Sequence, residues 1–206
     1  MKRKPSHRKL SAGQWRWRRI RRRGVVFALF LAGAVLVGLA DRAGLFGRRQ
    51  EPDLLRYHEK TFTVVHVVDG DTLDISLPDE DRPFTRIRLW GVDTPETVRP
   101  EHPVEYFGPQ ASAYTKKAAL HKPVRLELLP HRTRDKYHRL LAYVYLPDGK
   151  LLNRELIDAG LGYADPRFDH PKKREFLQRQ TRARRAKRGL WADPHPDDWP
   201  DYLTKD

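Results

Sequence analysis

The clearest hydropathy pattern in the chain is a series of short apolar or alternating runs after residue 60, which predicts β-strands. The first run, TFTVVHVV, is rich in β-branched residues and ends at Asp69-Gly70, a dipeptide typical of a tight turn. In the next run, apolar Leu73 and Ile75 alternate with polar residues, as in a strand with one buried face. The predicted strands span residues 61–68, 71–77, 86–92, 124–129 and 140–146.

Helical composition separates and follows these strands. The first helical segment ends before Pro123, the second is followed by Gly160 as a C-terminal cap, and the third ends at Gly189, after which Leu190 and Trp191 are expected to pack on the core. The predicted helices span residues 110–121, 151–159 and 172–188. Five strands with about three helices predict an α+β fold, mainly a β-barrel of the OB type with helices on its flank.

The front of the chain has a different pattern. Residues 24–40, GVVFALFLAGAVLVGLA, carry no charge, and 11 Lys and Arg precede them in residues 1–23. As a helix this stretch spans roughly 26 Å, slightly less than a hydrocarbon core of about 30 Å. The basic flank predicts a cytoplasmic N-terminus and a C-terminal domain outside the cytoplasm, periplasmic or extracellular. We expect a retained membrane anchor; the alternative is a cleaved signal, because Gly38-Leu39-Ala40 resembles a signal-peptidase site, and the protein would then be secreted.

These patterns divide the chain into five parts. They are a basic cytoplasmic leader (1–23), a transmembrane anchor or signal segment (24–40), a linker (41–59), the OB-type domain (60–192) and a C-terminal tail (193–206).

Charge is distributed as unevenly as hydropathy. The formal net charge is +14, yet residues 1–50 hold 14 basic residues and one acidic residue, while the remaining chain holds 27 basic and 26 acidic residues. Global basicity is therefore no evidence that the folded part binds nucleic acid, and any polyanion must be bound by locally placed cations. The absence of cysteine excludes disulfides, thiolate metal sites and a thiol nucleophile.

Five side chains at predicted strand ends and turns suit phosphodiester cleavage. Asp71 and Asp93 each follow a strand end and offer oxygen ligands to a hard divalent cation. Arg88 and Arg139 offer planar, permanently charged donors to a phosphate. Glu96 is then left to activate a water molecule.

The same residues lie in segments that resemble the staphylococcal nuclease, or thermonuclease, family. The similar segments occur in the family's order between about Thr61 and Trp191, and they read VVDGDTLDI (67–75), RLWGVDTPE (88–96), FGPQASAYTKK (107–117), RDKYHRLLAYVY (134–145) and LIDAGLGYA (156–164). The resemblance implies an OB-fold and calcium-dependent cleavage of both DNA and RNA, which leaves 3′-phosphate ends.

The resemblance also implies a role for each matching residue. Asp71 and Asp93 match calcium-ligating aspartates, and Thr94 matches a residue whose backbone carbonyl is a further ligand. Arg88 and Arg139 match phosphate-binding arginines, and Glu96 matches the proposed general base. For nucleotide binding, Tyr137 matches a tyrosine that lines the pocket, and Phe107 stands where the family has a tyrosine near the nucleotide phosphate.

Two further expectations concern the whole protein. We expect a monomer that acts on nucleic acid and contacts the membrane through residues 24–40. The alternative function is a catalytically inactive nucleic-acid or protein-binding module on the same fold, although the presence of all five polar side chains argues against it.

Overall fold

The computed structural model describes residues 32, 33, 35, 52–97 and 104–193. The chain divides into two units, residues 1–50 and 51–206, and the elements below belong to the second unit. In the described part of the chain, no helix is long and apolar enough to cross a membrane. The predicted leader lies outside the described residues, as does the predicted anchor apart from residues 32, 33 and 35 and the predicted tail apart from Asp193.

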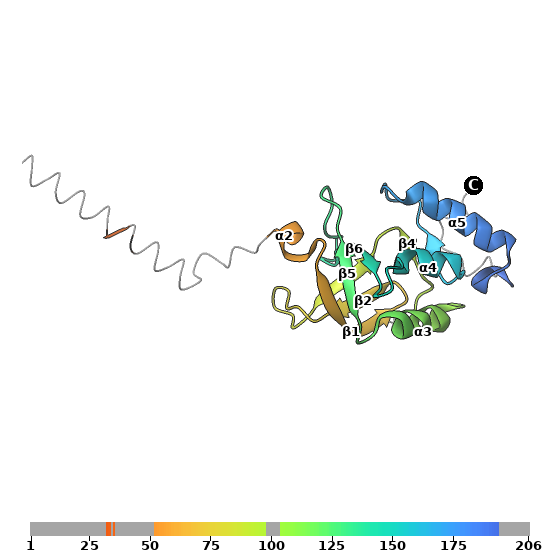
Figure 1. Ribbon diagram of the computed structural model, residues 1–206, viewed down its shortest axis with the longest axis horizontal. Helices are drawn as coiled ribbons and strands as arrows, with labels where there is room; N and C mark the ends of the chain where they lie inside the picture. Colours follow the sequence, from red (N-terminus) through yellow and green to blue (C-terminus); the bar gives the residue numbers. More distant parts are fainter. Residues whose placement is uncertain (1–31, 34, 36–51, 98–103, 194–206) are drawn as a thin grey trace, which may run out of the picture. The chain divides into compact units, whose positions relative to one another are not determined.

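Five strands form a closed barrel (Figure 1). They are β1 (Thr61–Asp69), β2 (Thr72–Ile75), β3 (Thr85–Leu89), β5 (Pro123–Glu127) and β6 (Leu140–Tyr145). Around the barrel the order is β1, β2, β3, β6, β5, and β5 closes the ring by pairing with β1. The β3–β6 pair is parallel and the other pairs are antiparallel. The predicted five-stranded OB-type barrel is confirmed.

The barrel interior is filled by apolar side chains that alternate along β2, β3, β5 and β6, whereas an irregularity in β1 separates its core residues, Val64 and Val67, by three positions. Leu73 and Ile75 of β2 are fully buried, as the alternation predicts. The neighbouring strands contribute Val64, Val67, Ile87, Leu89, Val124, Leu126, Leu140, Ala142 and Val144 to the same core cluster. Burial of these side chains removes apolar surface from water and stabilises the ring of strands.

The predicted strand 86–92 is interrupted in the structure. β3 ends at Leu89, and after a turn at Trp90-Gly91 a short strand, β4 (Val92–Asp93), pairs with β7 (Tyr163–Ala164) outside the barrel. Gly91 has φ +67°, and a Cβ there would lie 2.3 Å from Nε2 of His170. The turn therefore needs glycine, and it carries Asp93 away from the barrel onto a separate two-stranded sheet.

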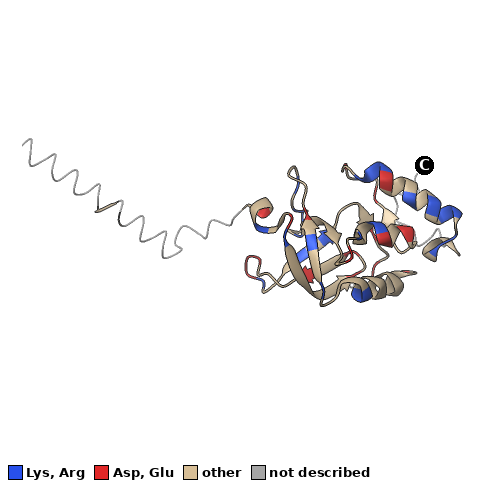
Figure 2. Ribbon diagram, viewed as in Figure 1, with Lys and Arg blue, Asp and Glu red and all other residues tan. Residues whose placement is uncertain are grey.

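Helices cover one side of the barrel (Figure 1). α3 (Gly108–Ala119) packs on β1, α4 (Leu152–Asp158) packs on β6, and α5 (Lys173–Arg185) packs on α4. Gly160 forms the predicted cap of α4, with φ +67°. Gly189 does not cap α5, because the helix already ends at Arg185 and Lys187 takes the left-handed conformation there, with φ +49°. A final 3₁₀ turn, η1 (Gly189–Trp191), buries Leu190 and Trp191 as predicted. Figure 2 shows that basic residues are spread along α5.

The barrel unit also includes part of the segment that we expected to be a linker. Residues 53–57 form a short helix, α2, and Tyr57 is fully buried, with its hydroxyl 3.1 Å from Oγ1 of Thr85. Arg134 fixes this helix because its guanidinium donates to Asp53 at 2.7 Å and to Asp79 at 2.7 Å. The helix was not predicted because it has only five residues, DLLRY, which are too few to show a helical periodicity.

Candidate active site

The turn between β1 and β2 forms one wall of the site. It contains Asp69, Gly70 and Asp71, and it packs so closely on α3 that a Cβ at Gly70 would lie 2.8 Å from Cβ of Ala111. Oγ1 of Thr115 donates a hydrogen bond to the Gly70 carbonyl at 2.6 Å. The glycine is required here by close approach, and the helix holds both aspartates of the turn in place.

Asp71 is a buried carboxylate, 2% exposed. It accepts hydrogen bonds from the Thr94 backbone N–H at 2.8 Å and from the Thr72 hydroxyl at 2.9 Å. It also forms an ion pair with Arg88. A carboxylate this deeply buried is stable only with such partners, so the site concentrates negative charge at a fixed position.

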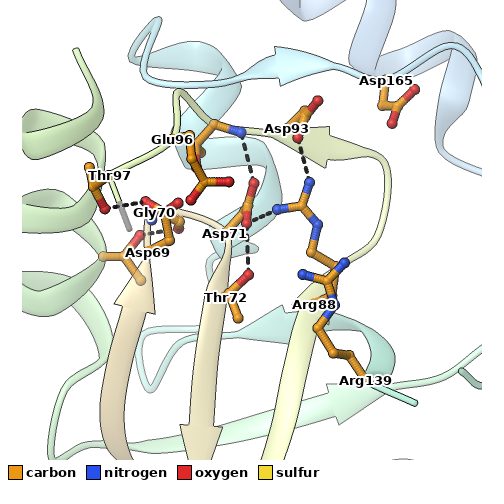
Figure 3. A network of polar contacts seen from close by, with 12 residues as sticks. Asp69, Gly70, Asp71, Thr72, Arg88, Asp93, Glu96, Thr97, Arg139 and Asp165 are labelled. Carbon is orange, nitrogen blue, oxygen red and sulfur yellow. Dashed lines mark hydrogen bonds and ion pairs between the residues drawn. The ribbon is translucent and has the colours of Figure 1, made fainter. Parts of the chain in front are cut away.

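Arg88 joins the two predicted metal-ligating aspartates. In the β2–β3 ladder Thr72 is paired with Arg88, so the start of β2 and the end of β3 meet at one end of the barrel. Figure 3 shows the guanidinium between Asp71 and Asp93, and its distance to Oδ1 of Asp93 is 2.5 Å. The positive charge of one arginine thus lies between two carboxylates that come from different sheets.

Glu96 lies beside this pair, in the loop that follows Asp93. Its backbone N–H donates to Oε2 of Glu105 at 2.9 Å, and its carboxyl group points toward Asp69 and Asp71 (Figure 3). Burial, together with a hydrogen bond to Glu96, raises the pKa of the Asp69 carboxyl to about 6. The Asp69 carboxyl therefore holds its proton to a higher pH than an exposed aspartate does. We call Asp69, Asp71, Asp93 and Glu96 the acidic cluster.

Arg139 is held by a neighbour that the sequence reasoning did not select. Asp135 accepts a hydrogen bond from Nε of Arg139 at 2.7 Å and from its backbone N–H at 3.0 Å. The guanidinium lies 5.3 Å from the ring centre of Tyr137, which is 61% exposed. Asp135 lies four residues before Arg139, and this spacing is the sequence signal that would have identified it.

A cavity of about 440 Å³, which we call the arginine cavity, contains both predicted phosphate-binding residues. Arg88 and Arg139 line it together with Tyr137. Asp71, Asp93 and Glu96 are not part of this lining, and Arg88 links the two aspartates to it through its ion pairs. The structure thus brings the five predicted side chains into one region, with the acidic cluster on one side of Arg88 and an open cavity on the other.

Two more residues belong to this region although the sequence reasoning missed them. Arg167 lies 3.2 Å from Oδ2 of Asp93 and 2.7 Å from Oδ2 of Asp165, and both Asp165 and Arg167 line the arginine cavity. Asp165 is 4% exposed. These residues follow β7, whose pairing with β4 brings them to the site. No local sequence pattern signals that long-range pairing.

Of the two remaining predicted residues, Thr94 lies at the site and Phe107 does not line the arginine cavity. Thr94 lies within the acidic cluster, and its buried hydroxyl has no hydrogen-bond partner among the described residues. Phe107 precedes α3 and packs on Tyr106, with ring centres 4.8 Å apart, and on the core clusters. It does not line the arginine cavity, so its contact with a nucleotide stays a prediction.

The donor set suits a hard cation. Among the described residues, no group of three or more carboxylate or imidazole side chains is arranged to hold a metal ion. The predicted calcium ligands are instead two carboxylates, Asp71 and Asp93, and one backbone carbonyl, that of Thr94. Arg88 shows that a positive charge is accommodated between the two carboxylates. Oxygen donors without thiolate or imidazole fit calcium better than zinc.

Comparison with known proteins gives a consistent result. A family model described as "Staphylococcal nuclease homologue" matches residues 86–193. The chain is 38% identical over 140 residues to a thermonuclease of Staphylococcus hyicus, an alignment that covers 66% of this chain and 78% of that protein. It is 41% identical over 133 residues to a thermonuclease of Staphylococcus intermedius, covering 64% and 76%. An uncharacterized endonuclease of Escherichia coli is 32% identical over 133 residues, covering 65% and 78%.

Proposed function

Since this chain belongs to the staphylococcal nuclease family and is a nuclease that acts on nucleic acid, we propose that it hydrolyses DNA and RNA in a calcium-dependent reaction that leaves 3′-phosphate ends. The observation that carries the proposal is the position of Arg88, which pairs with Asp71 and Asp93 while it also lines the arginine cavity with Arg139. A phosphate in that cavity contacts two arginines and lies next to the acidic cluster.

Each of these residues then has a role. Asp71, Asp93 and the backbone carbonyl of Thr94 would hold calcium, which would supply positive charge to the scissile phosphate. Arg88 and Arg139 donate to the phosphate oxygens, where negative charge increases in the transition state. Asp135 keeps Arg139 oriented through its 2.7 Å hydrogen bond.

Glu96 acts as the general base. It takes a proton from a water molecule, and the water oxygen forms a bond to phosphorus. The bond between phosphorus and the 5′ oxygen breaks, the 5′ oxygen takes up a proton from solvent, and the phosphate remains bound to the 3′ oxygen. Glu96 then releases its proton to solvent. Asp69 assists by its hydrogen bond to Glu96, which fixes the position of the base.

Digestion of plasmid DNA and of transcribed RNA by the full-length chain tests this proposal. We expect cleavage of both with calcium and none with chelator. The DNA fragments should be extended by a polymerase only after phosphatase treatment, because a 3′-phosphate blocks extension. Fragments that are extended directly would contradict the proposed products, and absence of calcium-dependent cleavage would favour the inactive binding module.

We also propose that residues 24–40 anchor the protein in the membrane with the catalytic domain outside the cytoplasm. The uncharged run and the basic residues before it support this orientation. Protease added to intact spheroplasts should digest the catalytic domain. Protection of the domain until the membrane is opened would contradict the orientation, and recovery of a shortened soluble form would show that the segment is cleaved.

A further inference from the structure

A second cavity adjoins the arginine cavity. It has a volume of about 700 Å³, and it shares Trp90, Arg132 and Phe168 with the arginine cavity. His131 and His170 complete its aromatic lining. We call this cavity the aromatic cleft. Because the two cavities share these residues, a ligand that fills the arginine cavity can extend into the aromatic cleft.

The aromatic cleft is lined by ring systems grouped around Trp90. The ring centre of Trp90 lies 6.3 Å from those of His131 and Phe168 and 6.1 Å from that of His170. Phe168 is 36% exposed, and the guanidinium of Arg132 lies 5.1 Å from its ring centre. A flat ligand can stack on this exposed ring or on the guanidinium above it, as bases do on proteins that bind single strands.

Two ring nitrogens of the cleft residues lack partners. Nε1 of Trp90 and Nε2 of His170 are buried and have no hydrogen-bond partner among the described residues. Trp90 is 2% exposed and His170 is 6% exposed. The other nitrogen of His170 lies 2.7 Å from the Tyr143 hydroxyl, which fixes the ring. Both atoms are enclosed by protein, and Nε2 of His170 lies against Gly91, where an added Cβ would be 2.3 Å away. A base in the cleft therefore stacks on exposed Phe168 and does not bond to these nitrogens.

The charge of the cleft indicates which part of a nucleotide it receives. Its lining has one basic and one acidic side chain, Arg132 and Asp169. The arginine cavity, in contrast, has Arg88, Arg139 and Arg167 in its lining. A phosphate therefore favours the arginine cavity, whereas an uncharged, flat base suits the aromatic cleft.

We propose that the aromatic cleft is a second base-binding subsite, which stacks the base of a nucleotide next to the one whose phosphate occupies the arginine cavity. This inference rests on the proposed function for the position of the phosphate. It implies that the protein binds a single strand over more than one nucleotide, with Phe168 and Arg132 as the stacking pair.

The test compares ligands of different length on the full-length chain and on Phe168→Ala. Binding of a fluorescent eight-nucleotide oligothymidylate and of thymidine 3′,5′-bisphosphate is measured by anisotropy and competition in chelator at physiological salt, so that cleavage does not contribute. We expect Phe168→Ala to weaken binding of the oligonucleotide by about tenfold, the range found for one stacked base, and binding of the single nucleotide by less than about twofold. Phe168 lines both cavities, so the proposal requires a clearly larger loss of affinity for the oligonucleotide, which reaches the cleft, than for the single nucleotide.

The matched control is Phe84→Ala. Phe84 also lies under an arginine, 5.6 Å from the Arg86 guanidinium, but it precedes β3 whereas Trp90 follows it, so it lies at the opposite end of that strand. We expect no change for either ligand. Residues 1–50 are identical in all variants, so their contribution to binding cancels when the affinity of each variant is divided by that of wild type. Equal weakening of both ligands by Phe168→Ala, or a change in oligonucleotide binding below about twofold, would overturn the proposal.

Two additional measurements keep the inference testable if Phe168→Ala does not fold. Arg132→Gln should weaken binding of the oligonucleotide more than binding of the single nucleotide, since it removes the cation of the stacking pair from a residue that lines both cavities. An eight-nucleotide strand with 5-iodouracil should crosslink under light to the peptide that contains Trp90 or to the peptide that contains Phe168, and crosslinks confined to residues 1–50 would contradict the subsite. A wild-type protein that shows this binding pattern but does not cleave with calcium would refute the proposed function and leave the subsite intact.

Discussion

At the scale of single residues, the central feature is a guanidinium shared between two functions. Arg88 neutralises Asp71 and Asp93, and it also faces the arginine cavity. Lysine keeps the charge but loses the planar, two-pronged donor geometry, so it cannot serve both carboxylates and a phosphate at once.

Arg88→Lys should therefore lower kcat/KM by about a hundredfold or more, as loss of a transition-state donor does. The matched control is Arg86→Lys, on the same strand two residues earlier. Nε of Arg86 lies 2.8 Å from Oδ1 of buried Asp74, and Arg86 does not line the arginine cavity. Steady-state cleavage rates measure both. Similar cleavage rates for the two variants would show that Arg88 does not stabilise the transition state.

Glu96→Gln separates chemistry from binding. The amide keeps the shape of the side chain but cannot accept a proton from water, so the cleavage rate should fall by about 10² to 10⁴-fold. Affinity for an oligonucleotide should stay within about threefold of wild type. Glu59→Gln, at a surface pair with Arg125, serves as the control and should leave both values unchanged. A near wild-type rate for Glu96→Gln would show that another group is the base.

His170 gives a prediction on pH. Burial, with a contribution from Lys173, lowers the pKa of its imidazole below the ordinary value of 6.5. The unfolded chain therefore binds more protons than the folded chain in the window just below pH 6.5, and the free energy of unfolding falls as pH decreases through that window. His170→Asn should flatten this part of the curve, as measured by denaturant unfolding in chelator. If the free energy of unfolding of His170→Asn varies with pH as that of wild type does, His170 does not have a lowered pKa in the folded protein.

The sequence alone identifies the residues of a local motif better than those brought in by distant contacts. Asp71, Arg88, Asp93, Glu96 and Arg139 lie at strand ends and turns that hydropathy marks, and the structure gathers them. Asp165 and Arg167 reach the site through the pairing of β4 with β7, which links positions about 70 residues apart. Such pairing is a property of the folded chain and has no short-range signature.

At the scale of elements, the same distinction applies. The barrel strands were predictable because the inside and outside of a barrel alternate with a period of two residues. The break after β3 was not, because Gly91 adopts its turn against His170, which lies far along the chain. α2 was missed because it is only five residues long and is held by long-range contacts, namely the burial of Tyr57 and the hydrogen bonds from Arg134 to Asp53.

The turn between β1 and β2 is the element on which the acidic cluster depends. Gly70→Ala should lower the free energy of unfolding by about 1–3 kcal/mol, since its Cβ would lie 2.8 Å from both Ala111 and Thr94. The cleavage rate should fall as well, because the turn holds Asp69 and Asp71. Chemical denaturation and steady-state kinetics measure the two effects.

Gly149→Ala is the control for this substitution. Gly149 has φ +79°, and a Cβ added there would have no atom within 4 Å, so alanine adds backbone strain without a packing conflict. We expect a stability loss of about 1 kcal/mol and an unchanged cleavage rate. Equal effects of the two substitutions on the rate would contradict a special role for the β1–β2 turn.

At the scale of the whole molecule, charge and chemistry are separated along the chain. Residues 1–50 hold most of the net positive charge, while the barrel unit has nearly balanced charge and gathers several arginines at one cavity. In the proposed arrangement the first part positions the enzyme at the membrane, and the second part cleaves nucleic acid. Calcium, abundant outside cells, fits a catalytic domain in that location.

A calcium titration of cleavage by wild type and by Asp71→Asn tests the proposed metal site and the reaction together. A labelled strand is digested over a range of calcium concentrations, and the rate is plotted for each protein. We predict that wild type is inactive in chelator and fully active with calcium, and that Asp71→Asn needs at least about tenfold more calcium, because it loses one of two ligand charges. Cleavage by wild type in chelator, or the same calcium midpoint for both proteins, would contradict the proposed mechanism.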